Sequence, residues 1–164
     1  MKSEPRSKTQ SRLLRGKPDE FDELSIDDLR EIKRAPWTGV RNYEARNFMR
    51  DKMQVGDLIL FYHSNAKPSG PAGIAEVASA PYPDFTQWDK KNKHYDPKAS
   101  KEKPVWYMVD VSFVERFPHT ITRDELRAVP ELAYMQLWKR NRLSITLLSK
   151  VEFETIVQLA TSLT

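Results

Sequence analysis

Three apolar runs of strand length, each bounded by turn residues, predict a β-sheet. Leu58–His63 is almost continuously apolar and follows a glycine turn. Ala72–Ala78 comes after a loop of proline, glycine and serine, a spacing that indicates a hairpin of the two runs. In Val105–Val114 every second residue is apolar or aromatic, which predicts a strand with one buried side. We expect all three runs to share one sheet system.

Helix-start signals lie on both sides of these runs, before the first and after the last. Ser25 and Asp28 form a capping box before a short helix that should reach about Lys33. Asn42 is expected to cap a second helix, Tyr43–Lys52, by accepting a first-turn N–H group. Two more capping boxes and one strand-like alternation follow, at Thr122–Glu125, Ser149–Glu152 and Leu143–Leu147. Together these elements predict an α+β fold in one domain, residues 1–164, with a small curved sheet and peripheral helices.

Charge is unevenly distributed along the 164 residues. The net charge is +4 and the isoelectric point is about 9.2. A predicted loop at residues 5–23 is basic in its first part, residues 19–33 are acidic, and a second predicted loop at residues 81–104 holds six lysines. Basic patches attract phosphate, although an isolated lysine is more often simply solvated. Aromatic residues in the second loop indicate that it is partly ordered.

Cysteine and long apolar segments are both missing from the sequence. The first absence excludes a disulfide framework and thiolate zinc sites. The second excludes a membrane span, which needs ~20 apolar residues. We therefore expect a protein of the nucleus or cytosol that has no membrane partner.

The sequence also lacks the usual signatures of enzyme chemistry. It has five glycines, and none is arranged as a phosphate-cradling GxGxxG or GxxxxGK loop. The three histidines are far apart and lack metal-ligand spacing, so we expect no catalytic residue, metal or cofactor. His63 is ambiguous: it ends an apolar strand beside Ser64 and Asn65, a position that suits either a site mouth or a histidine bonded to the backbone.

Aromatic and basic residues gather where the second helix begins. Trp37 precedes a turn that leads through Arg41 and Asn42 into Tyr43. Such an arrangement can stack a base while an asparagine reads a base edge. Taken singly, however, Trp37 and Tyr43 are more typical of a core than of a site, and Arg41 is more typical of a solvated surface.

Eight ordered motifs extend over nearly the whole chain. They are Lys2–Pro5, Trp37–Tyr43, Ala45–Arg50, Phe61–Asn65, Gly73–Ala75, Tyr95–Lys98, Trp106–Val111 and Arg142–Ser144. In combination they resemble the EVE domain, and within it the thymocyte nuclear protein family. The chain departs from that family in one respect, because only Met1 precedes Lys2. The first strand of the family fold is therefore expected to be clipped.

The resemblance implies a PUA-like, β-rich pseudobarrel, a fold shared with modules that bind RNA or modified bases. It also implies a monomeric reader of modified bases in DNA, modified cytosine being the usual candidate, which takes a flipped base into an aromatic pocket. The pocket residues that the motifs carry over are Ser3, Trp37, Arg41, Asn42, Tyr62, His63, Ser64, Asn65, Arg142 and Ser144. Phosphate contacts are expected from Arg46, Arg50, Lys98 and Lys101.

Two other functions remain open from the residues. ASCH domains, which resemble this fold, include amidohydrolases that use a lysine and a glutamate, and Lys2 and Glu4 supply both types. This alternative is a small amidohydrolase that acts on a modified nucleoside. The other is a protein-interaction adaptor that uses the acidic segment Asp19–Glu31, although acids at a helix start are ordinary partners of the helix dipole.

Overall fold

The computed structural model describes residues 24–64, 66–140 and 142–162 in full and residues 2–3 as backbone. Five strands form the main sheet in the order β1 (Lys2–Ser3), β3 (Leu58–His63), β4 (Gly70–Val77), β7 (Asp110–Arg116) and β2 (Arg34–Pro36). The β1–β3 pair is parallel and the other pairs are antiparallel. Register shifts between Phe61 and Tyr62 and between Ile74 and Ala75 mark bulges, which bend and twist the sheet.

The predicted hairpin and the shared sheet are both confirmed, because β3, β4 and β7 are neighbours in that order. The predicted strand Val105–Val114 is wrong in one detail. It is divided at Val109, whose carbonyl accepts the Trp37 N–H group at 2.9 Å. The first part, β6 (Tyr107–Met108), pairs instead with β5 (Tyr82–Pro83) in a separate two-stranded sheet.

The predicted strand at Leu143–Leu147 is also wrong, because this segment is irregular. Leu143 and Ile145 do point into the core, as the alternation requires. Within the described ranges the segment pairs with no strand, and the Leu147 N–H group donates to the Gln136 side chain at 2.9 Å. Alternating burial therefore arises here without strand pairing.

The predicted helix starts are confirmed by their capping bonds. Helix α1 (Ile26–Ile32) has the Ser25–Asp28 capping box, and α2 (Tyr43–Asp51) begins at Asn42. A capping box of Thr122 and Glu125 precedes α3 (Arg123–Arg127). The remaining helical elements are η3 (Phe85–Trp88), η4 (Pro130–Leu132), α4 (Gln136–Lys139) and α5 (Lys150–Ser162). Within the described ranges, none of these helices has the length and apolarity that crossing a membrane requires.

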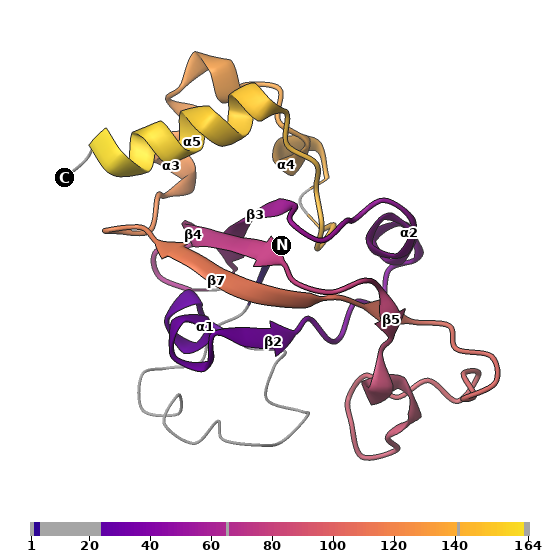
Figure 1. Ribbon diagram of the computed structural model, residues 1–164. Helices are drawn as coiled ribbons and strands as arrows, with labels where there is room; N and C mark the ends of the chain where they lie inside the picture. Colours follow the sequence, from indigo (N-terminus) through magenta and orange to yellow (C-terminus); the bar gives the residue numbers. More distant parts are fainter. Residues whose placement is uncertain (1, 4–23, 65, 141, 163–164) are drawn as a thin grey trace.

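Apolar side chains form two cores, one on each face of the main sheet. Helices α3, α4 and α5 cover one face and α1 lies against the other, as Figure 1 shows. Phe61 belongs to the core shared with α1 and α2, whereas Tyr62 belongs to the core under α5. A Cβ at Gly73 would lie 2.3 Å from the Glu115 carbonyl oxygen and 2.7 Å from Ile26 Cγ1. Glycine is therefore required for α1 to lie this close to β4.

Candidate nucleic-acid interface

Arg41 anchors the lysine-rich loop to the start of α2. Its Nη1 lies 2.9 Å from Asp84 Oδ2, and the Asp84 side chain is fully buried. Its Nε and Nη2 donate to the His94 carbonyl oxygen at 3.0 and 2.7 Å, and Nη2 also donates to Thr86 Oγ1 at 2.9 Å. Most guanidinium donors are thus used inside the protein. This geometry indicates that Arg41 shapes the surface rather than grips a ligand directly.

The loop itself is ordered, as its aromatic content predicts. Gln87 Oε1 accepts the N–H groups of Val105 and Trp106 at 2.9 and 3.0 Å, so a buried side chain replaces strand pairing there. Trp106 Nε1 donates to Asp96 Oδ2 at 2.7 Å. Hydrogen bonds from the Lys98 backbone and from Trp106 lower the pKa of Asp96. The loop is therefore a fixed wall beside α2.

Two of the predicted phosphate-binding residues, Arg46 and Arg50, lie along one side of α2 over aromatic rings. The Arg46 guanidinium carbon is 4.8 Å from the Tyr43 ring centroid, and Nη1 donates to the Val105 carbonyl at 2.8 Å. Arg50 lies 5.7 Å from the Tyr107 ring centroid and pairs with Asp51. The other two predicted residues, Lys98 and Lys101, are exposed on the loop. We call α2 and the adjoining loop at residues 81–104 the α2–loop surface, and all four predicted cations belong to these two segments.

Asn42 already has a structural role. Its Oδ1 accepts the Ala45 N–H group at 3.0 Å and so caps α2. The acceptor half of this amide is therefore committed to the helix. The NH₂ half is the part that can donate to an acceptor on a base edge.

Trp37, Phe61 and His63 form a row of ring contacts on the α1 side of the sheet. The Trp37 and Phe61 centroids are 5.4 Å apart and those of Phe61 and His63 are 5.7 Å apart, both edge-to-face. Trp37 is 7% exposed and belongs to the core cluster. The backbone of Ser3 pairs beside His63, which places β1 next to this row. Trp37, which follows β2, therefore contacts side chains from the last residues of β3.

His63 caps α1 from a distant part of the chain. Its Nε2 accepts the Ile26 N–H group at 3.1 Å. This bond requires the neutral tautomer with its proton on Nδ1. Burial lowers the pKa of His63, and Arg116 acts in the same direction while Asp27 opposes it. The sequence left a site role and a backbone-bonded role open, and the structure shows the bonded role.

We expect acidification below about pH 6.5 to destabilise the fold through His63. Because its folded-state pKa is lowered from 6.5, the unfolded chain takes up a proton that the folded chain does not. Stability should fall by at most ~1.4 kcal/mol per pH unit across this window. Urea unfolding of the wild type and His63→Gln at about pH 7.5 and pH 5.5 measures it. If His63→Gln loses as much stability as the wild type between these two pH values, a group other than His63 causes the loss.

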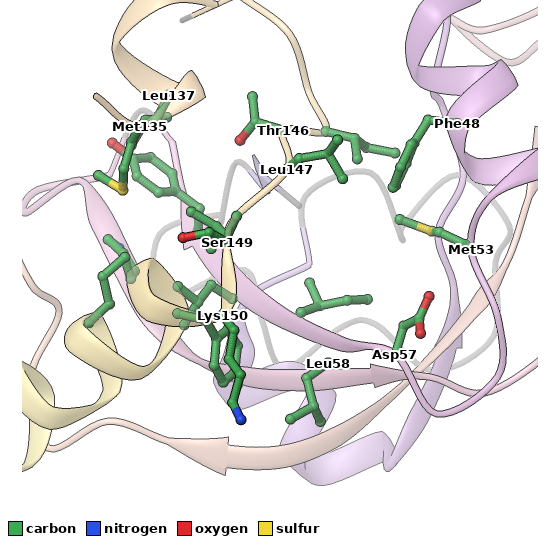
Figure 2. A pocket seen from close by; sticks show the side chains of 18 of the residues that line it. Phe48, Met53, Asp57, Leu58, Met135, Leu137, Thr146, Leu147, Ser149 and Lys150 are labelled. Atoms are coloured by element: carbon green, nitrogen blue, oxygen red, sulfur yellow. The ribbon is translucent and has the colours of Figure 1, made fainter. Parts of the chain in front are cut away.

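A pocket of about 490 Å³ opens on the other face of the sheet, between β3, α2 and the segment leading into α5. Of the predicted site residues, Tyr62 and Ser144 line it, whereas Trp37, Asn42 and His63 do not. Figure 2 shows Phe48 of α2 and Met53, which follows α2, on one side and Ser149 and Lys150 on another. Tyr62 belongs to the core on this face, whereas His63 bonds to α1. The structure therefore does not bring the Tyr62 and His63 side chains together.

The structure does not place the remaining predicted residues in contact with the Trp37 row among its described interactions, and some fall outside the described residues. Arg142 is exposed and Ser144 is half-buried, and Ser144 lines the pocket together with Tyr62. Ser64 is half-buried directly after His63. Asn65, Glu4 and the side chains of Lys2 and Ser3 fall outside the described residues, as do residues 19–23 of the predicted acidic segment Asp19–Glu31.

Sequence reasoning missed Asp84, Gln87, Tyr43 and Trp106 as organisers of the surface. Tyr43 is 59% exposed, against the expectation that it belongs to the core. One signal was available: Tyr43, Arg46 and Arg50 are spaced three and four residues apart, so that they share one helical face. An aromatic residue on a basic face is better placed for a ligand than for a core.

Comparison with known proteins identifies the family. A family model described as the EVE domain matches residues 13–159. The chain belongs to the EVE domain family. Human thymocyte nuclear protein 1 is 41% identical over 169 residues, which cover 97% of this chain and 72% of that protein. The sequence-based resemblance is therefore confirmed.

Solved structures confirm the α+β, PUA-like fold. Human THYN1 protein in complex with DNA containing 5-methylcytosine superposes with a TM-score of 0.84 at 39% identity. That match covers 98% of this chain and 95% of the human one. A protein from Leishmania major gives a TM-score of 0.82 at 49% identity, over 85% of this chain and 88% of that one. Where the structure describes side chains, it places no group of three or more metal-binding residues together.

Proposed function

We propose that this chain acts as a single EVE domain that binds DNA and reads a modified cytosine. The observation that carries this proposal is the human relative of the same fold in complex with DNA containing 5-methylcytosine. The two chains are 39% identical over nearly the whole length of each and have the same fold. A DNA partner would place the protein in the nucleus. The activity is one of binding, without a catalytic residue.

The base site in this proposal lies at the end of β3. Trp37 and His63 are the buried rings there, held together by Phe61. We assign to the same site Arg142, which is exposed, Ser144 and Ser64, which are half-buried, and the NH₂ group of Asn42. In this arrangement the rings define the floor, whereas the rim donates and accepts the hydrogen bonds that discriminate between bases.

DNA phosphates would meet the cations on the α2–loop surface. Lys98 and Lys101 are exposed, whereas Arg46 and Arg50 are held in place by aromatic rings. Prior ordering lowers the entropy lost on binding for the two arginines. Base flipping costs a few kcal/mol, and both the phosphate contacts and the base contacts offset that cost.

Asn42→Ser tests the base-reading role without removing the helix cap, because serine caps a helix as well as asparagine does. We expect the variant to lose preference for 5-methylcytosine duplex over the unmodified duplex by roughly 1–3 kcal/mol. Its melting temperature should stay at the wild-type value. Fluorescence anisotropy with the two matched duplexes gives the ratio of affinities.

Lys98→Ala is the matched phosphate variant. It should weaken binding to both duplexes equally and reduce the salt slope by about 0.9. Equal wild-type affinity for the two duplexes would refute modified-base reading. An Asn42→Ser variant with an undiminished ratio would remove Asn42 from the site and leave the rest of the proposal in place.

A further inference from the structure

Tyr43 presents an exposed ring on a rigid support. The residue is 59% exposed although it packs on Trp106, which is 5% exposed. The two ring centroids are 4.9 Å apart at an interplanar angle of 28°, a stacked arrangement. Trp106 is itself fixed by the bond from Nε1 to Asp96. An exposed aromatic ring held in this way loses little conformational entropy when a ligand stacks on it.

Trp106 stacks on one face of the Tyr43 ring, and neither Trp106 nor Arg46 covers the opposite face. The Arg46 guanidinium carbon lies 4.8 Å from the Tyr43 centroid and 5.8 Å from the Trp106 centroid. With Tyr43 and Trp106 4.9 Å apart, the three groups form a nearly equilateral triangle. Were Arg46 and Trp106 on opposite faces of Tyr43, their separation would be close to the sum of the two shorter distances. Arg46 therefore leaves the outer face of the ring open.

The charges around the ring suit a nucleic-acid strand better than a protein segment. Arg46 lies beside Tyr43, and Arg50, which is paired with Asp51, is one helical turn further along the same face. Lys98 is close because its N–H donates to Asp96 Oδ1, while Asp96 Oδ2 accepts from Trp106. The acid nearest in sequence, Glu44, is paired with Arg140. An open ring flanked by cations fits a base with a phosphate on each side.

We propose that Tyr43 is a stacking platform for an unpaired DNA base, distinct from the site that reads the modified cytosine. The inference rests on the proposed binding of DNA, and it names the strand state that this surface prefers. Stacking needs an exposed base face, so the platform selects single-stranded or locally opened DNA over closed duplex. It is tolerant of sequence, because every base has a π-face.

The test measures affinity for a single-stranded oligothymidylate and for an abasic strand of the same length. Tyr43→Ala and Tyr43→Leu should both lower oligothymidylate affinity by about 5- to 150-fold, whereas Tyr43→Phe should stay within about twofold. Leucine keeps an apolar contact with Trp106 and so controls for loss of packing. Abasic-strand affinity should be the same for all three variants, because only phosphates are contacted there.

Tyr134→Ala is the matched surface control, since Tyr134 is 83% exposed and lies outside the α2–loop surface. It should leave both affinities unchanged. Equal losses on the abasic strand and on oligothymidylate for Tyr43→Ala would overturn the platform, as would unchanged affinity for oligothymidylate. The 5-methylcytosine preference is measured in parallel on duplexes. It should survive Tyr43→Ala, so failure of the platform and failure of modified-base reading give different results.

Discussion

Replacement of Asp84 by alanine is expected to lower the free energy of unfolding by about 3–5 kcal/mol. The Asp84 side chain is fully buried and accepts from Arg41 Nη1 and from the Gly39 N–H group, each at 2.9 Å. It also accepts the Thr86 N–H group at 2.8 Å. Alanine would leave buried donors without their acceptor and the guanidinium without its counter-charge. Urea denaturation with a constant m-value measures the loss.

Asp89→Ala is the control for this prediction. Asp89 is an exposed acid of the same loop. The one hydrogen bond described for its side chain is accepted by Oδ1 from the Lys91 N–H group. We expect a loss below about 1 kcal/mol for it. The double variant Arg41→Ala/Asp84→Ala should cost little more than Asp84→Ala, because both residues act in one network. Additive losses would show that Arg41 stabilises the loop independently of Asp84.

Local features of the sequence predicted the structure well because their partners are close along the chain. The Ser25–Asp28 box and the Asn42 cap each join residues three apart, and both are present. The nearly continuous apolar run Leu58–His63 likewise indicated a strand, and all of its residues after Leu58 are buried. The PUA-like fold was predicted from the resemblance of the motifs to the EVE domain, because no local pattern specifies such a fold.

Roles that depend on distant partners were not predictable from the sequence. Asp84 lies 43 residues from Arg41, and Ile26 lies 37 residues from His63. An arginine that is solvated and an arginine that anchors a loop have the same local sequence. The same holds for a histidine that binds a ligand and a histidine that caps a remote helix. Only the packing of the two segments distinguishes these roles.

Trp37 and Tyr43 show how neighbouring aromatics in one motif acquire opposite roles. Both are more typical of a core when taken singly, yet Trp37 is 7% exposed and Tyr43 is 59% exposed. Trp37 continues from β2 and bonds through its backbone to Val109, which directs its ring under the sheet. Tyr43 is the first residue of α2 and lies beyond the edge of that core. The five residues between these positions contain the turn that separates a buried ring from an exposed one.

Phe61→Ala is expected to lower the free energy of unfolding by about 3–5 kcal/mol, because the ring is fully buried and its removal leaves a cavity. The edge-to-face contacts with Trp37 and His63 are lost as well. Val114→Ala, at a 43% exposed position of β7, is the control and should change stability by no more than about 0.5 kcal/mol. Urea unfolding of the two variants separates a core position from a surface position in the same sheet.

A milder change at the same position separates the two proposed DNA contacts. Phe61→Leu keeps an apolar side chain but removes the ring that holds Trp37 and His63 in place. We expect it to weaken preference for 5-methylcytosine duplex while leaving oligothymidylate affinity unchanged, because Tyr43 is supported by Trp106. Tyr43→Ala should give the opposite pattern. If both variants reduce both properties together, the base site and the stacking platform are one coupled surface rather than two contacts.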